Sequence, residues 1–193
     1  MWVALLPAAY LLGTFPSALL VARANGIDIA AVGSGNPGAS NVTRTLGWRK
    51  GVWVFVLDAL KGAAATGVGL LVDGRPAGYW LGAAAIVGHV FPIIRRVRGG
   101  KGVATGAGVM AVLHPLIAIV LMVAWFAVSR LTAKASIASI AVVTLLPVGV
   151  AATGSPGWEV AASIGLCALV MARHLANIKR LLTRGEPKLS SST

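Results

Sequence analysis

The sequence has few charged residues and very few acidic ones. Among 193 residues, 17 are Lys or Arg, only 5 are Asp or Glu, and the charged fraction is 11%. Soluble domains carry roughly 25% charged residues. With a mean hydropathy of +0.84, this shortage excludes an ordinary soluble protein and indicates an integral membrane protein. The single cysteine, Cys167, also excludes an intrachain disulfide and a cluster of thiolate metal ligands.

Metal and cofactor chemistry are not expected either. His89 and His114 are separated in the sequence, and neither has a cluster of carboxylates or thiolates beside it. The sequence therefore predicts no metal site and no cofactor. Asp58 and Lys61 are spaced i, i+3 within an apolar stretch, where an unpaired charge is costly, so we expect them to form an internal ion pair.

The formal net charge of +12 comes from basic residues that lie between apolar stretches. Because they do not form one soluble basic face, they predict no nucleic-acid partner. They fit the excess of Lys and Arg in cytoplasmic segments of membrane proteins. Fifteen of the 17 lie in four segments: Arg23, Arg44, Arg49 and Lys50; Arg95, Arg96, Arg98 and Lys101; Arg130 and Lys134; Arg173, Lys179, Arg180, Arg184 and Lys188.

Six apolar stretches alternate with these segments, at 2–22, 51–71, 78–94, 102–128, 135–152 and 158–172. The first is too long for the core of a signal peptide and lacks a cleavage site, so we expect it to be a membrane span. Six crossings, however, place the basic segment at 95–101 and the basic C-terminal segment on opposite sides of the membrane. Pro115 disfavours continuous helix in the fourth stretch. If this stretch forms two helices of about 12 residues, each about 18 Å long, all four basic segments lie on the same side of the membrane.

The resulting prediction is one all-α domain, residues 1–193, built as a polytopic transmembrane helix bundle. It has seven helical segments, some of them short, with the N-terminus outside and the C-terminus inside. A segment shorter than the roughly 30 Å hydrocarbon core is expected to be buried among neighbours or to line a cavity. A plain six-span protein with a weaker charge bias is the alternative.

The first polar segment is GSGNPGASN, residues 33–41. Its glycines, Gly33, Gly35 and Gly38, allow positive φ and close approach, so its backbone amides are candidates for an anion-binding nest. Polar side chains and a cation follow: Ser34, Asn36, Ser40, Asn41 and Arg44. A guanidinium can hold a phosphate in a bidentate manner. The alternative is a turn whose Ser and Asn residues cap a helix.

Two further polar segments share the predicted cytoplasmic face, where all three can converge. In RVRGGKG, Gly100 and Gly102 bracket Lys101, and a nucleotide-binding G-x-x-x-x-G-K-[ST] pattern is missing. We expect a glycine turn that opens a helix, whose N-terminus and lysine favour an anion. In HLANIKR, His174 and Asn177 share the face of a helix that continues out of the membrane.

Ser136 and Ser139 lie one turn apart at the start of an apolar stretch. They are expected either to hydrogen-bond a neighbouring helix or to face a ligand.

Taken together, these segments resemble the bacterial membrane-integral acyl-phosphate:glycerol-3-phosphate acyltransferases. The resemblance covers nearly the whole chain in order, through GSGNPGASNVTRTLG (33–47), LDALKG (57–62), HVFP and RGGKGVATG (within 89–106), and HLANIKRLLTRGEPK (174–188). The chain departs from the family pattern at Ala30, where arginine is usual, and at 134–137, where KASI replaces YVSL.

The resemblance implies transfer of a fatty acyl group from acyl phosphate to the 1-hydroxyl of sn-glycerol 3-phosphate, which gives lysophosphatidic acid and phosphate. It implies an enzyme of the cell membrane in phospholipid biosynthesis, with seven helices and a cytoplasmic active site. Its partners are the two substrates and membrane lipids, with no obligate protein partner. A transporter or channel for a phosphorylated solute, or a purely structural lipid-binding protein, is the rival class.

On this basis we expect Ser34, Asn36 and the glycine amides to hold acyl phosphate, while Lys101 and Arg44 hold glycerol 3-phosphate. His174 and Asn177 are expected to orient that substrate or assist its deprotonation. Ser34 acts either as a covalent nucleophile or only as a hydrogen-bond donor during direct attack. The predicted catalytic residues are Ser34, His174 and Asn177, and the predicted substrate-binding residues are Gly33, Gly35, Asn36, Gly38, Asn41, Arg44, Gly100, Lys101, Gly102, Ser136 and Ser139.

Overall fold

The structure, a computed structural model, describes residues 1–95, 98–183 and 185–189. Within these ranges every regular element is a helix, which confirms the all-α class. The chain forms two compact units, Met1–Leu113 and His114–Thr193. The boundary between them falls where His114 and Pro115 were predicted to interrupt the fourth apolar stretch.

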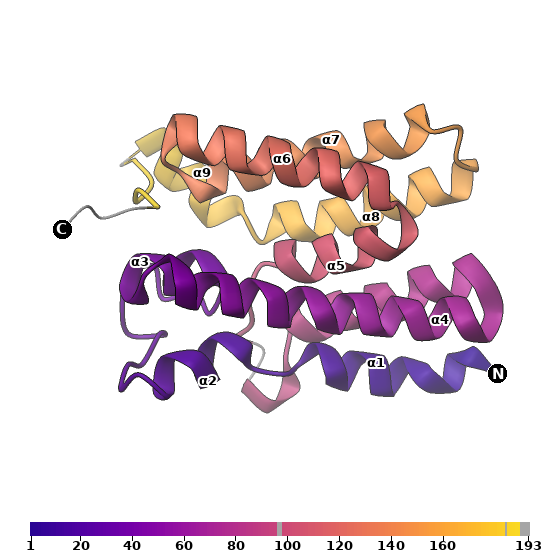
Figure 1. Cartoon of the computed structure of the whole chain (residues 1–193), viewed down its shortest axis with the longest axis horizontal. Coiled ribbons are helices and arrows are strands. Elements are labelled where there is room, and N and C mark those ends of the chain that lie inside the picture. The colour runs from indigo at the N-terminus through magenta and orange to yellow at the C-terminus, as the bar shows by residue number, and fades with distance from the viewer. Residues whose placement is uncertain (96–97, 184, 190–193) are drawn as a thin grey trace. The chain divides into compact units, whose positions relative to one another are not determined.

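The first unit is built around α4, which packs against α1, α3 and α5 (Figure 1). Its elements, in chain order, are η1 (Trp2–Leu5), α1 (Leu6–Gly13), α2 (Ser17–Arg23), α3 (Ala39–Leu46), α4 (Trp48–Val90), η2 (Ile93–Arg95) and α5 (Val103–Leu113).

The first apolar stretch is not one continuous helix, as the prediction of a single span at 2–22 had assumed. Helix α1 ends at Gly13 and α2 begins at Ser17. Pro16 stands at the start of α2 with a non-helical backbone, φ −91° and ψ 59°, and it has no N–H to continue the ladder of α1. The break leaves polar backbone inside an apolar segment.

Helix α4 contains two of the predicted spans. Its 43 residues are interrupted at Asp73 and Gly74, where Gly74 adopts φ 68° and ψ −159°. Glycine tolerates that conformation because it has no Cβ. Beyond the turn the two halves lie very close, since a Cβ on Gly69 would stand 2.5 Å from the oxygen of Ala77. The second half ends at Val90 rather than at residue 94.

Glycines also bring α4 and α5 into close contact. A Cβ on Gly62 would lie 2.2 Å from the oxygen of Thr105, and one on Gly108 would lie 1.9 Å from the oxygen of Ala59. Small residues at such crossings let helices pack tightly in membranes, where lipid removes the usual hydrophobic drive between them. The 11-residue α5 is short, as predicted, and it is held by this packing.

The second unit consists of α6 (Pro115–Thr132), α7 (Ala135–Ala152), α8 (Gly157–Ala172) and α9 (Leu175–Thr183). Helix α7 packs against both α6 and α8. Pro115 occupies the first turn of α6, where its missing N–H costs nothing. Helix α6 has 18 residues and extends through Arg130, so the prediction of about 12 residues for this half was wrong.

In the described part of the chain, four helical segments are long and apolar enough to cross a membrane: Trp2–Arg23, which includes the break at Pro16, Trp48–Val90, Pro115–Thr132 and Ala135–Ala152. A fifth is added if α8 and the bent α9 count as one span. Many outward side chains are large and apolar; Leu71 is 90% exposed and Leu131 is 86% exposed. Such a surface suits lipid rather than water. The number of crossings, the orientation of the termini and the single domain over 1–193 stay predictions.

Candidate active site

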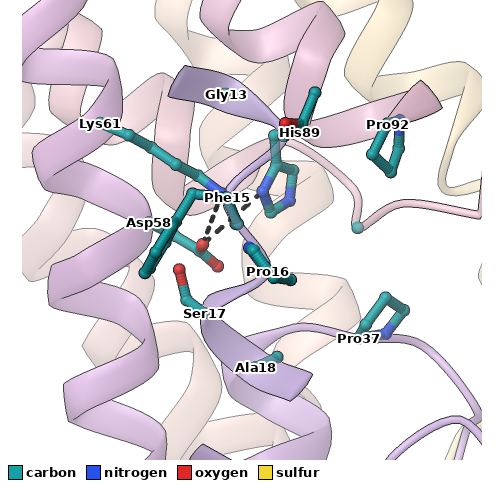
Figure 2. Close-up of a pocket in the computed structure, with 12 residues that line it drawn as sticks. Gly13, Phe15, Pro16, Ser17, Ala18, Pro37, Asp58, Lys61, His89 and Pro92 are labelled. Atoms are coloured by element: carbon teal, nitrogen blue, oxygen red, sulfur yellow. Dashed lines mark hydrogen bonds and ion pairs between the residues drawn. The ribbon is translucent and has the colours of Figure 1, made fainter. Parts of the chain in front are cut away.

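A polar pocket lies in the first unit, at the break in the first apolar stretch (Figure 2). It combines the interrupted backbone after α1, charged side chains of α4 and one residue from each of two polar loops. The lining residues are Gly13, Thr14, Phe15, Pro16, Ser17, Ala18, Pro37, Asp58, Lys61, His89, Pro92 and Gly100.

The predicted ion pair of α4 is present in this pocket. Lys61 Nζ lies 2.9 Å from Asp58 Oδ1, and the two side chains are only 4% and 3% exposed. Lys61 Nζ also donates to the carbonyl oxygen of Phe15 at 2.9 Å, in the break between α1 and α2. The ammonium group thus neutralises a buried carboxylate and supports a backbone carbonyl that the interrupted helix exposes.

His89 joins the pair, because its Nδ1 lies 3.7 Å from Asp58 Oδ1. In the second unit His114 Nε2 lies 3.1 Å from Glu159 Oε2. Each histidine thus has a single carboxylate partner, which comes from a different helix or helix half and which the sequence did not predict. Among the described residues, no group of three His, Cys, Asp or Glu side chains could hold a metal ion.

The GSGNPGASN loop is organised by Asn41, a residue of α3 that is 1% exposed. Its Oδ1 accepts from the amide of Ser34 at 2.9 Å. Its Nδ2 donates to the carbonyls of Ile29 at 3.1 Å and Val32 at 3.0 Å. Gly33, at φ 60°, passes so close that a Cβ there would lie 2.3 Å from Asn41 Oδ1. Asn41 therefore fixes the loop, and its predicted contact with a substrate stays a prediction.

The anion-nest interpretation of this loop does not fit its hydrogen bonds. The amides of Ser34, Gly35, Asn36 and Gly38 donate to Asn41 Oδ1, Val32 O, Ser34 Oγ and Asn36 O respectively. The capping alternative fails as well, because Gly38 is the N-cap of α3 and no side chain caps it. The half-buried side chains of Ser34 and Asn36 can still contact a ligand. So can Arg44, which lies outside the loop in the last turn of α3.

The second loop is packed against His89. The amide of Gly100 donates to the carbonyl of His89 at 3.1 Å. A Cβ on Gly100 would lie 2.1 Å from His89 Nε2, and one on Gly99 would lie 2.2 Å from His89 O. Gly102 has φ 89°, and α5 begins directly after it at Val103. The predicted glycine turn before a helix is confirmed, and it presents a half-buried Lys101.

The third segment belongs to the second unit, and it does not continue α8 as predicted. The axis bends by 53° between α8 and α9, and His174 lies at the bend with its Nδ1 2.8 Å from the carbonyl of Val170. Asn177 Nδ2 donates to Glu186 Oε1, and Arg180 Nε donates to Glu186 Oε2 at 2.8 Å. The buried Glu186, which sequence reasoning missed, thus holds two residues of α9.

The two serines of α7 differ in their surroundings. Ser139 Oγ accepts from Trp125 Nε1 at 3.0 Å, so it makes the expected bond to a neighbouring helix. Ser136 Oγ is buried, and within the described parts of the chain it has no hydrogen-bond partner. Ser17 Oγ in the pocket of the first unit shares that property. Sequence reasoning missed Ser17, although its position after Pro16 in an apolar stretch could have drawn attention to it.

The structure brings two of the predicted segments to one place, because Pro37 of the first loop and Gly100 of the second line the same pocket. Lys101 belongs to the second loop and Arg44 to the helix after the first, and the pocket holds a serine hydroxyl with no partner among the described residues. Convergence of the third segment, which lies in the other unit, stays a prediction. The fold and the site define a multi-pass membrane protein with a polar pocket in its first helical unit.

Comparison with known proteins identifies the family. The family model described as "Glycerol-3-phosphate acyltransferase" matches residues 3–184. The chain is 39% identical over 187 residues to "Glycerol-3-phosphate acyltransferase 3" of Bacillus anthracis, covering 95% of this chain and 93% of that protein. It is 40% identical over 196 residues to "Glycerol-3-phosphate acyltransferase" of Thioalkalivibrio sulfidiphilus, covering 98% and 95%.

Among solved structures, the chain is similar to PlsY (YgiH), an integral membrane glycerol 3-phosphate acyltransferase. The crystal structure of its glycerol 3-phosphate form has a TM-score of 0.92 and 35% sequence identity, covering 97% of this chain and 94% of that one. A second crystal structure, of its lysophosphatidic acid form, has a TM-score of 0.90. The chain belongs to the glycerol-3-phosphate acyltransferase family.

Proposed function

We propose that this protein transfers a fatty acyl group from acyl phosphate to the 1-hydroxyl of sn-glycerol 3-phosphate, giving lysophosphatidic acid and phosphate. The observation that carries the proposal is the meeting of the two motif loops at one pocket, through Pro37 and Gly100. Membership of the family and the similarity to PlsY in its glycerol 3-phosphate form support the acceptor. The family resemblance of the motifs supports the donor.

The proposed site uses side chains rather than a nest of amides. Lys101 and Arg44 hold the phosphate of glycerol 3-phosphate, because both are cations of motif segments in the first unit, Lys101 in the second loop and Arg44 in the last turn of α3. Ser34 and Asn36 donate hydrogen bonds to acyl phosphate. The glycines at 33, 35, 38, 100 and 102 serve by giving the two loops their shape. On their sequence motif, His174 and Asn177 orient the acceptor, and Ser136 and Ser139 remain candidate substrate contacts.

Direct attack accounts for the reaction with the fewest groups. The 1-hydroxyl oxygen forms a bond to the acyl carbonyl carbon, the phosphate leaves with the electron pair of the broken carbon–oxygen bond, and a phosphate oxygen takes the hydroxyl proton. Acyl phosphate is already activated, so positioning and charge stabilisation are the main tasks. No cofactor is needed. Ser34 N and Oγ both serve the fold of their own loop, which favours a hydrogen-bonding role over a nucleophilic one.

The donor is tested with purified protein in detergent. Glycerol 3-phosphate is offered with palmitoyl phosphate, palmitoyl-CoA or palmitoyl acyl carrier protein, and radiolabelled lysophosphatidic acid is measured. We expect product with palmitoyl phosphate, and less than one hundredth of that rate with the other two donors. Equal or faster product formation from the thioesters would overturn the proposed donor. Specific binding of glycerol 3-phosphate with no product from any donor would instead favour the transporter class.

We also propose that the protein lies in the cell membrane with its N-terminus outside, its C-terminus inside and its site at the cytoplasmic face. In a Cys167→Ser background, Asn25→Cys and Gly154→Cys are labelled with an impermeant maleimide in intact cells. We expect labelling of position 154 only, because the turn between α7 and α8 is uncharged and the loop after α2 belongs to a basic segment. Labelling of position 25 from outside would invert the proposed orientation.

A further inference from the structure

We propose that Asp58, Lys61 and His89 act together as positioning residues that hold the Gly99–Gly102 turn, and with it Lys101, at the pocket. The inference rests on the proposed function in one respect, since it assigns Lys101 to the binding of glycerol 3-phosphate. It predicts that changes deep in α4 alter the affinity for that substrate in particular.

The network links the pocket wall to the second loop by a continuous chain of contacts. Figure 2 shows Lys61, Asp58 and His89 directed toward one another, with Phe15 beside them. Lys61 is 2.9 Å from both Asp58 Oδ1 and the Phe15 carbonyl. Asp58 in turn faces His89 Nδ1 at 3.7 Å, a distance that a water molecule or a small ring shift can bridge.

From His89 the chain of contacts continues into the glycine turn. The main-chain carbonyl of His89 accepts from Gly100 N at 3.1 Å, and its ring fills the space in which a Cβ of Gly100 would stand. The turn therefore takes its position from the orientation of this ring and from the end of α4 at Val90. A rotation of the ring would remove the surface on which Gly100 packs, immediately before Lys101.

The segment between His89 and the turn has a second anchor. Tyr10 in α1 donates its hydroxyl to the carbonyl of Phe91 at 2.7 Å and accepts from the amide of Ile93 at 3.1 Å. This anchor fixes the backbone that follows α4, but it does not contact the His89 ring. Asp58, whose carboxylate is itself held by Lys61, faces the ring at Nδ1 and so contributes to its orientation.

An ion pair that only balances charge and one that also positions His89 respond differently to mutation. Asp58→Asn alone leaves the Lys61 ammonium buried without its counter-ion, which is destabilising in any case. Asp58→Asn combined with Lys61→Met removes both charges and keeps both shapes. If charge balance were the whole role, the double variant would behave like the wild type. If Asp58 positions His89, the double variant regains stability while the turn remains loosened.

The experiment compares the wild type, Asp58→Asn, Lys61→Met and the double variant as full-length purified protein in detergent. Glu159→Gln is the matched control, because it disrupts a buried carboxylate–histidine pair that is outside the residues lining the pocket. Thermal midpoints, kcat, and KM for glycerol 3-phosphate and for palmitoyl phosphate are measured. Amide hydrogen exchange of peptides that cover residues 98–103 is followed without substrate.

For the double variant we expect a thermal midpoint above that of Asp58→Asn, at least tenfold faster exchange at 98–103 than in the wild type and at least a tenfold higher KM for glycerol 3-phosphate. The KM for palmitoyl phosphate should change less than threefold. Wild-type exchange and KM in the double variant would overturn the proposal, as would parallel losses for both substrates that Glu159→Gln reproduces.

If the double variant does not fold, a second pair of variants, at His89, tests the same proposal. His89→Asn keeps a nitrogen near the position of Nδ1, whereas His89→Leu removes it, and the first should retain slower exchange at 98–103 than the second. Equal exchange in the two variants would overturn the proposal. The exchange measurements need no turnover, so they test the positioning role even if wild-type protein makes no lysophosphatidic acid and the proposed function fails.

Discussion

Replacement of Asn41 by alanine distinguishes a side chain that shapes the first loop from one that binds substrate. The side chain makes three hydrogen bonds, to Ser34 N, Ile29 O and Val32 O, at 2.9, 3.1 and 3.0 Å. A typical intramolecular hydrogen bond contributes about 1 kcal/mol net. At 1% exposure, water cannot easily replace them. The loss is therefore about 3 kcal/mol of local stability, or roughly a 150-fold change in an opening equilibrium.

The assay is amide hydrogen exchange of peptides over residues 29–36 in detergent, without substrate. Asn41→Ala should accelerate exchange at Ser34 and its neighbours by roughly 100-fold. Asn41→Asp should not restore protection, because it keeps the acceptor for Ser34 N but turns a carboxylate toward the Ile29 and Val32 carbonyls. Asn25→Ala is the control, since Asn25 makes one exposed bond to Val21 O. It should change stability by less than about 0.5 kcal/mol.

One outcome would refute the assignment of Asn41 to the fold of the loop. If Asn41→Ala left exchange over 29–36 unchanged while it raised the KM for either substrate, the side chain would act on the ligand after all. Loss of turnover alone would not decide, because a disordered loop also misplaces Ser34 and Asn36. The exchange measurement therefore has to accompany the kinetics.

Three further substitutions probe the two loops. Gly100→Ala places a Cβ 2.1 Å from His89 Nε2, so it should lower the free energy of unfolding by about 1 to 3 kcal/mol and raise the KM for glycerol 3-phosphate. Gly67→Ala is the control, because a Cβ there has nothing within 4 Å and should change neither quantity. Lys101→Met should raise that KM roughly tenfold to 150-fold and spare the KM for acyl phosphate, and unchanged steady-state kinetics would remove Lys101 from the site. Ser34→Ala should slow turnover about 100- to 1000-fold, and intact-protein mass spectrometry of the wild type with acyl phosphate alone should show no adduct; a hydroxylamine-sensitive adduct lost in Ser34→Ala would establish a covalent intermediate.

Features that depend on neighbouring residues could be predicted from the sequence. Apolar composition predicted the helices, and the i, i+3 spacing of Asp58 and Lys61 predicted their ion pair. Pro115 predicted the helix boundary that also separates the two units. Pro16 gave no such prediction, because proline inside an apolar stretch is compatible with a continuous transmembrane helix when neighbours satisfy the freed backbone. Here Lys61, distant in the chain, satisfies the Phe15 carbonyl.

The motif glycines show the limit of a local interpretation. Their spacing correctly predicted a turn at Gly102, where positive φ is needed. It also suggested an anion nest at 33–38, which the structure does not support, because a nest requires free amides and whether amides are free depends on what folds over them. The Asn41 side chain takes one of these amides, and its loop takes others. No count of glycines can reveal that.

The sequence by itself determined an all-helical membrane protein, its family motifs and the residue types that suit phosphate, since hydropathy, proline and charge act over one or two helical turns. Only the tertiary structure decided which polar residues meet. Asp58 and His89 face each other because α4 folds back at Gly74. Pro37 and Gly100 line one pocket because the first loop lies between α2 and α3, which pack on α4, and the second loop follows the end of α4 itself. Those encounters arise from the packing of distant segments, which no local pattern in the chain encodes.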